Sequence, residues 1–169
     1  VASADYMAQN NLGTTIGVIY DSSDVYSAGI FEKFDAQAKA NGLNVACVEA
    51  FTADNKADLT TQVTKCKDAG CDLVFLPFYA TEAAQVLTYA DKIGYKPTFF
   101  GCDGLDGVLT VEGFDPALAE GVKYNTVPPL FTENLAIIRL TKYKDFLFCN
   151  GNVRQRLLLL RAAARKGIR

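Results

Sequence analysis

Residues 72–79, Asp-Leu-Val-Phe-Leu-Pro-Phe-Tyr, decide the fold of this 169-residue chain. Their four apolar residues, 73–76, form a continuous run without alternation, which is typical of a strand covered by helices on both faces of a parallel sheet. Pro77 has no N–H group to donate to a neighbouring strand, so the chain is expected to leave the sheet there. Tyr79 then lies at the carboxyl edge of the sheet, where ligands bind in open α/β folds.

Helical and strand patterns alternate regularly on both sides of this segment. We predict helices over residues 2–10, 26–40, 57–69 and 81–93, with Thr81 as a helix N-cap, and strands over residues 15–20, 43–49, 73–76 and 98–101. Because βαβ crossovers are right-handed, this order predicts an α/β fold, a three-layer α/β/α sandwich with a mainly parallel sheet in the order 2-1-3-4.

The charge of the chain changes sharply near residue 124. Residues 1–124 contain 17 acidic residues and 8 Lys with no Arg, whereas residues 125–169 contain 2 acidic residues, 3 Lys and 6 Arg. We therefore divide the chain into an α/β body over residues 1–124 and a basic tail of different origin over 125–169, with helices expected at 135–147 and 153–166. A basic helix can bind nucleic acid or an anionic membrane, but the tail lacks interleaved aromatics and a groove-reading motif, so neither partner is predicted.

Cysteine usage argues against a metal site and against catalysis by a Cys/His pair. The chain has five cysteines, no Cys-x-x-Cys motif and no His. Cys66 and Cys71 either form a disulfide or remain small buried thiols, and the sequence leaves both readings open. Cys47 and Cys102 are expected to lie three strand spacings apart, about 14 Å, which is too far for a disulfide.

No apolar run approaches the roughly 18 residues of a membrane-spanning helix. The chain begins at Val1 without a Met and without a basic, apolar leader, so we expect an excised piece whose targeting signal is missing.

Three loops should meet at the carboxyl edge of the sheet, after the first, third and fourth strands. They contain Tyr26, Tyr79 and Asp103. Two aromatic rings and one carboxylate form a half-cage suited to an ammonium group, through charge pairing and attraction to the ring faces. Taken singly, Tyr26 could instead be a packing residue at a helix start, and Asp103 a helix cap.

Four segments resemble one known family. They are Ile-Tyr-Asp-Ser-Ser-Asp-Val-Tyr-Ser at 19–27, Phe-Thr-Ala at 51–53, Asp-Leu-Val-Phe-Leu-Pro-Phe-Tyr at 72–79 and Phe-Phe-Gly-Cys-Asp-Gly at 99–104. They look like the second lobe of the branched-chain amino-acid-binding proteins of ABC importers, which have the type I periplasmic-binding fold. The resemblance covers residues 1–124.

The resemblance implies an extracytoplasmic solute-binding protein, periplasmic or lipid-anchored. It would pass an amino acid of the branched-chain type, or a related small solute, to an ABC permease without catalysis, cofactor or metal. The resemblance places the ligand contacts on Tyr26, Tyr79 and Asp103, with Asp103 meeting the α-ammonium group. The family's first lobe, which binds the α-carboxylate, is absent. Residues 125–169 do not resemble the family's continuation, and a frameshift or cloning artefact would account for them.

Three other kinds of domain share the predicted topology. A ligand-sensing domain of a receptor or regulator would have the same fold. A receiver-type domain requires an acid where Tyr79 stands, and a flavodoxin-like domain requires a phosphate loop where residues 21–24 carry two acids, which would repel phosphate.

Overall fold

The computed structural model describes residues 1–126, 136–139 and 147–148. Its helices are α1 (Ala2–Asn10), α2 (Val25–Ala40), α3 (Thr60–Asp68) and α4 (Ala80–Lys92). Its strands are β1 (Ile16–Asp21), β2 (Val45–Phe51), β3 (Leu73–Leu76), β4 (Thr98–Gly101), β5 (Lys123–Thr126), β6 (Ala136–Arg139) and β7 (Leu147–Phe148). Three short 3₁₀ helices follow β4: η1 (Asp103–Leu105), η2 (Val108–Thr110) and η3 (Pro116–Ala119).

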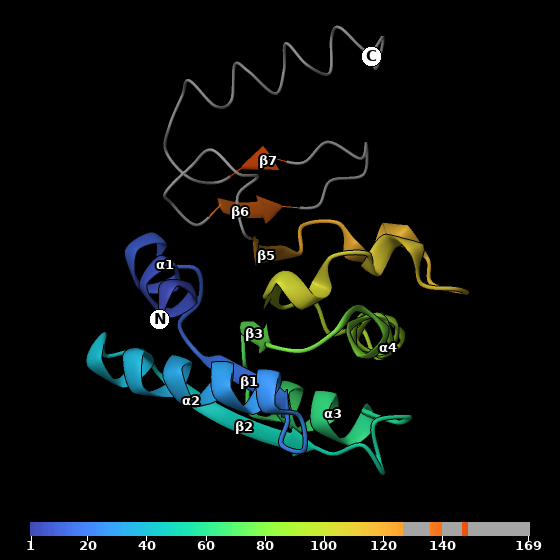
Figure 1. Cartoon of the computed structure of the whole chain (residues 1–169), viewed down its shortest axis with the longest axis horizontal. Helices are drawn as coiled ribbons and strands as arrows, with labels where there is room; N and C mark the ends of the chain where they lie inside the picture. Colours follow the sequence, from blue (N-terminus) through green and yellow to red (C-terminus); the bar gives the residue numbers. More distant parts are fainter. Residues whose placement is uncertain (127–135, 140–146, 149–169) are drawn as a thin grey trace, which may run out of the picture.

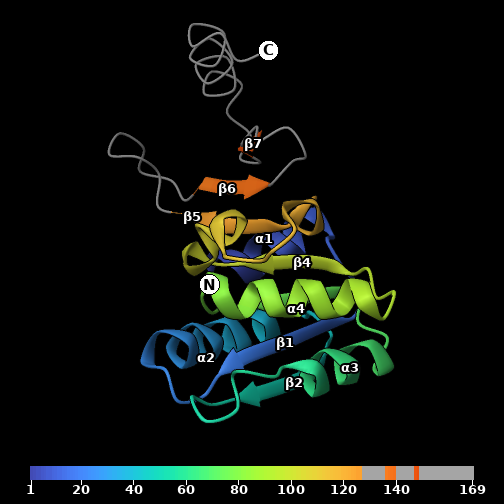
Figure 2. The same cartoon turned by 90° about the vertical axis from the view of Figure 1, so that its right-hand side faces the viewer.

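The strands form one sheet in the order β2-β1-β3-β4-β5-β6-β7. From β2 to β5 every neighbouring pair is parallel, and β6 and β7 continue the sheet antiparallel. Figure 2 shows β2 at the bottom, then β1, β4, β5 and β6, with β7 at the top. The predicted order 2-1-3-4 is confirmed, and β3 has the predicted bounds. The strand β5 was not predicted.

Helices cover both faces of the sheet, as the apolar run of β3 predicts. Leu73 and Phe75 belong to a buried cluster with residues of α1 and α2, whereas Val74 and Leu76 belong to a second cluster with residues of α3 and α4. The two helix pairs lie on opposite sides of the sheet in Figure 1. This is the predicted three-layer sandwich.

A carboxylate joins the amino ends of β1 and β3. Asp72, directly before β3, accepts hydrogen bonds of 2.9 Å from the backbone N–H groups of Thr14 and Thr15 and one of 2.6 Å from the Thr14 hydroxyl. Burial alone would raise the pKa of Asp72, but these hydrogen bonds outweigh it and lower the pKa. The clamp fixes the two strands side by side, so their carboxyl ends also meet.

Several element boundaries differ from the predictions, the most at α3, which starts at Thr60 where residue 57 was predicted, and at β2. The strand β2 continues to Phe51, which was predicted as loop, because Phe51 pairs with Asp21 at the end of β1. The helix α4 starts at Ala80 with Tyr79 in the N-cap position, and no side chain caps it. The prediction of Thr81 as N-cap is wrong, since Thr81 already lies in the first helical turn.

The predicted helix over residues 135–147 is wrong where the structure describes it. Ala136–Arg139 and Leu147–Phe148 are strands, because Ala136–Arg139 pairs with β5 and with β7. The predicted helix over 153–166 lies outside the described residues. Among the described residues, no helix has the length and apolar character needed to cross a membrane.

Candidate functional site

The three predicted site residues lie together at the carboxyl edge of the sheet. The rings of Tyr26 and Tyr79 are stacked, with centroids 5.1 Å apart and planes inclined by 19°. The Tyr26 hydroxyl donates a hydrogen bond of 2.5 Å to Oδ1 of Asp103. Tyr79 remains 49% exposed, and Asp103 is exposed as well. The structure thus joins side chains from the loops after β1, β3 and β4 into one aromatic and acidic cluster.

The loop after β1 holds Tyr26 in the first turn of α2. Asp24 is the N-cap of this helix, and its carboxylate accepts the N–H group of Ser27 at 2.9 Å. The fully buried Ser27 hydroxyl in turn accepts the N–H group of Asp21 at 2.8 Å. Because both ends of this loop are hydrogen-bonded, the start of α2 is fixed relative to β1.

The Tyr26 hydroxyl is used inside the protein. Besides donating to Asp103, it accepts the backbone N–H group of Gly104 at 3.0 Å. Burial and the hydrogen bond to Asp103 raise the pKa of Tyr26, so the hydroxyl keeps its proton at neutral pH. Tyr26 therefore offers a ligand its ring face, while its hydroxyl orients the Asp103 carboxylate.

The loop after β4 holds Asp103 between two buried anchors. Cys102 is packed in the cluster with α1 and α2, and Leu105 is fully buried in the cluster on the opposite face. These anchors leave the Asp103 carboxylate at the surface of the edge. Among the described residues no hydrogen bond reaches its second oxygen, Oδ2.

Gly104 is a site residue that the sequence reasoning missed. A Cβ atom there would lie 2.6 Å from the backbone oxygen of Phe78 and 3.1 Å from the Tyr26 hydroxyl. The loops after β3 and β4 approach this closely only because residue 104 has no side chain. A glycine directly after the candidate acid was the available signal.

We expect Gly104→Ala to destabilise the chain by about 1–3 kcal/mol, because backbone atoms of Phe78 cannot yield as a flexible side chain would. Urea unfolding of the 169-residue chain measures this effect.

Gly29→Ala is the matched control for this change. Gly29 lies inside α2, and a Cβ atom there would meet no other atom within 4 Å. Alanine should therefore leave stability unchanged or raise it by about 0.5–1 kcal/mol. Equal stability of the two variants would contradict the close packing described for Gly104.

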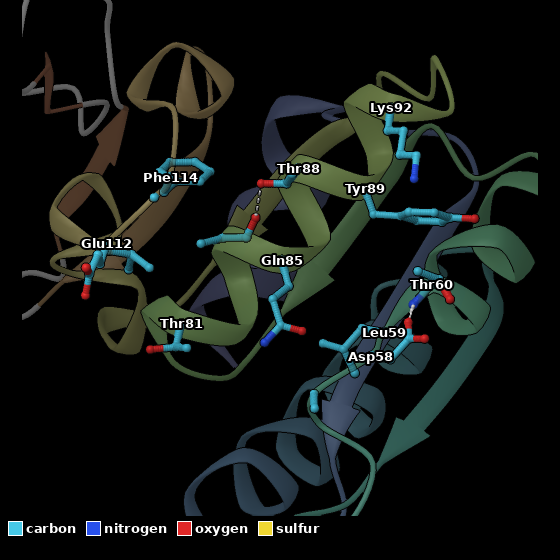
Figure 3. A pocket seen from close by; sticks show the side chains of 14 residues that line it. Asp58, Leu59, Thr60, Thr81, Gln85, Thr88, Tyr89, Lys92, Glu112 and Phe114 are labelled. Atoms are coloured by element: carbon cyan, nitrogen blue, oxygen red, sulfur yellow. Dashed lines mark hydrogen bonds between the residues drawn. The ribbon is translucent and has the colours of Figure 1, made fainter.

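A separate groove of about 470 Å³ runs along α4. Figure 3 shows it between α4, the start of α3 and the segment around Glu112, with Thr81 and Lys92 toward opposite ends of α4. Its lining includes none of the three predicted site residues. Two of its polar groups are bound locally, the Thr88 hydroxyl to the Ala84 oxygen and the Thr60 N–H group to Asp58. The charged lining residues Asp58, Lys92 and Glu112 lie at three separate places around the groove in Figure 3.

The edge cluster can hold a small cation. Among the described residues one oxygen of the Asp103 carboxylate has no hydrogen bond, and with the two stacked rings beside it this carboxylate offers charge pairing and ring-face attraction to an ammonium group. Within the described residues, no group of three His, Cys, Asp or Glu side chains could hold a metal ion.

Comparison with solved structures agrees with the α/β fold. The leucine-binding protein of Thermotoga maritima has a TM-score of 0.65 at 22% identity, over 74% of this chain and 35% of that protein. A branched-chain amino acid ABC transporter protein of Thermus thermophilus, solved with bound valine, has a TM-score of 0.63 at 21% identity, over 74% and 32%. At these identities the likeness establishes the fold.

Sequence comparison adds the family. The leucine-, isoleucine-, valine-, threonine- and alanine-binding protein of Pseudomonas aeruginosa is 27% identical over 143 residues, which are 83% of this chain and 37% of that protein. Leu/Ile/Val-binding protein homolog 8 of Brucella abortus is 30% identical over 82 residues, 48% of this chain and 20% of that protein. The chain thus spans only 37% and 20% of the lengths of these two curated relatives.

A match to a protein family covers the body of the chain and excludes the receiver-type and flavodoxin-like alternatives. The sequence profile of the family described as periplasmic binding protein matches residues 1–129, from the start of the chain to just beyond β5. That match spans all five parallel strands and the three loops that carry the edge cluster, and the chain therefore belongs to the family of periplasmic binding proteins.

Proposed function

We propose that this lobe binds an amino acid of the branched-chain type as one of two lobes of an extracytoplasmic solute-binding protein. In this role Asp103 pairs with the α-ammonium group, and the rings of Tyr26 and Tyr79 form a wall beside it. The observation that carries the proposal is the Asp103 carboxylate, which the Tyr26 hydroxyl orients at 2.5 Å while its other oxygen has no hydrogen bond within the described residues.

The relatives support the class of ligand. One is named as a binder of leucine, isoleucine, valine, threonine and alanine, and one solved neighbour contains valine. Every amino acid in this set shares the α-ammonium group, which is the feature that the edge cluster suits. The first lobe would supply donors for the α-carboxylate and close the site.

We propose that the protein delivers its bound amino acid to an ABC permease, without a catalytic step. A ligand-sensing domain of a receptor with the same fold would use the same sheet edge. Amino-acid-dependent binding to a permease supports the importer, whereas signalling by a fused or associated domain supports the sensor.

Analogues of leucine test the ligand contact in the full-length, two-lobed protein. We expect leucine to bind, and isocaproate, which is leucine without its amine, to bind at least about 30-fold more weakly because the Asp103 charge then lacks a partner. Isothermal titration calorimetry measures both affinities.

Isopentylamine, which keeps the amine and lacks the carboxylate, is the control. It should also bind weakly, because it cannot use the donors of the first lobe. Isocaproate binding as tightly as leucine would contradict the role of Asp103.

A further inference from the structure

Three cysteines meet under α3, on the face of the sheet that α3 and α4 cover. Cys47 lies on β2, Cys66 near the end of α3 and Cys71 just before β3. The thiol of Cys66 donates to Sγ of Cys47 across 3.8 Å. All three side chains are buried, and Cys47, at 9% exposed, is the most accessible.

Gly17 on β1 provides the space for these sulfurs. It is the register partner of Cys47 on β2, and a Cβ atom on it would lie 3.0 Å from Sγ of Cys66 and 3.1 Å from Sγ of Cys71. Any larger residue at this position would displace the thiols. The packing of the sheet therefore brings sulfurs from separate elements together.

We propose that Cys47 and Cys66 are a disulfide site, which a thiol oxidant converts into a covalent link between β2 and α3. The sulfur atoms are already in contact at 3.8 Å and need to approach by less than about 2 Å to reach bonding distance. Disulfides form and persist in the periplasm, the compartment for which the family is named. The proposal does not depend on which ligand the lobe binds.

The oxidant in this reaction is a small disulfide such as oxidised glutathione. The Cys47 thiolate attacks one sulfur of the oxidant, forms a mixed disulfide and releases one glutathione thiolate. The Cys66 thiolate then attacks the Cys47 sulfur, which forms the Cys47–Cys66 bond and releases the second glutathione thiolate. The two protein thiols lose two electrons and two protons in total, and the oxidant gains two electrons and becomes two thiols after protonation.

The solvent exposure of the two thiols determines the order of these steps. Cys47 lies on the edge strand β2, whereas Cys66 has no exposed surface. Burial raises the pKa of both thiols, so the reaction should be slow at neutral pH and faster in alkaline buffer. The nearby Lys65 ammonium partly offsets this rise at Cys47.

The link would support the loop beside the candidate site. Cys47 and Cys66 are 19 positions apart, and the intervening segment includes Phe51 and Ala53. The Phe51 oxygen accepts the Ser22 N–H group, and the Ala53 N–H group donates to the Ser23 hydroxyl. A covalent clamp on this segment would therefore also restrain the loop after β1.

Peptide mapping of the oxidised 169-residue chain is the direct test. Trypsin cleavage leaves the three cysteines on separate peptides: Cys47 on residues 40–56, Cys66 on 66–67 and Cys71 on 68–92. After treatment with oxidised glutathione at about pH 8.5, chosen to populate the thiolate, we expect 40–56 joined to 66–67. We also expect two of the five thiols to be lost in a titration of the denatured chain. A link between 66–67 and 68–92, or unlinked peptides, would overturn the proposal.

Serine variants show whether the link acts on the folded protein. Oxidation should raise the melting temperature of the wild type and of Cys71→Ser by about 5 °C or more, and should leave that of Cys47→Ser unchanged. A rise in Cys47→Ser equal to that of the wild type would contradict the assignment. The peptide map decides the pairing even if a variant folds poorly, because it uses the wild-type chain.

Discussion

Replacing Asp103 by asparagine in the full-length protein is expected to weaken amino-acid binding by a factor of about 30 to several thousand, at an almost unchanged melting temperature. The carboxylate is the only charged member of the proposed cluster. In a closed and largely dry cleft, its loss leaves the ligand's ammonium group buried without a partner. This corresponds to about 2–5 kcal/mol of binding free energy.

Asparagine is the informative substitution because the structure shows how the loop would keep its shape. The Tyr26 hydroxyl donates to Oδ1 of Asp103, and the amide oxygen of asparagine can accept the same bond. The anchors Cys102 and Leu105 are untouched. The change therefore removes charge and leaves the local geometry in place.

Asp106→Asn is the matched control for this substitution. Asp106 lies in the same loop, is exposed and loses the same charge, but it is not part of the cluster. Its variant should bind like the wild type. Wild-type affinity of the Asp103→Asn variant at wild-type stability, measured by calorimetry and thermal unfolding, would remove Asp103 from the site.

Local sequence signals predicted those parts of the fold that depend on local chemistry. The run Leu73–Leu76 lies between a charged residue and a proline, so both ends of β3 are marked, and they are correct. The predicted bounds of α1 are also correct, and its C-cap is Asn11, whose backbone is left-handed with φ of 47°.

At β2 and β5 a distant residue decides the boundary. The strand β2 continues to Phe51 because β1 offers it a partner at Asp21. The strand β5 is short and polar, and it exists because Lys123 and Tyr124 pair with Phe100 and Gly101 of β4. No local pattern contains these pairings.

In the candidate site, too, the sequence predicted which residues gather but not the contacts between them. Loop positions after β1, β3 and β4 were enough to predict that Tyr26, Tyr79 and Asp103 gather at one edge. The hydrogen bond between Tyr26 and Asp103 joins residues 77 positions apart, and the close approach at Gly104 depends on the backbone of Phe78. Such contacts require the three-dimensional packing of two loops.

The boundary near residue 124 stays a prediction. The family match ends at residue 129, close to the change in charge. The match to the Pseudomonas aeruginosa relative covers 83% of the chain and so extends past residue 124, and β5, β6 and β7 all join the sheet. We propose that the basic tail is foreign to the fold. Translation of the gene in another frame should then restore an acidic, Tyr-containing continuation, and the same tail in an undisturbed genomic frame would contradict this proposal.

The 169-residue chain alone is expected to bind leucine with millimolar affinity or not detectably. One lobe offers about half of the contacts, yet it bears most of the roughly 4–15 kcal/mol that association costs in lost freedom of motion. Its charge pair also forms in water, since Asp103 and half of the Tyr79 side chain are exposed. At a separation of about 4 Å a pair of unit charges in water gains only about 1 kcal/mol, far less than in a closed cleft.

Titration of the chain with leucine, followed by calorimetry and by NMR shifts of the site loops, measures this affinity beside that of the full-length protein. The expected gap is about a thousandfold or more, because lobe closure both buries the ligand and adds the carboxylate donors. If weak shifts appear in the chain, Asp103→Asn should abolish them and Asp106→Asn should not. Micromolar leucine binding by the chain itself would mean that this lobe holds a complete site, and that closure against a first lobe is not what creates the affinity.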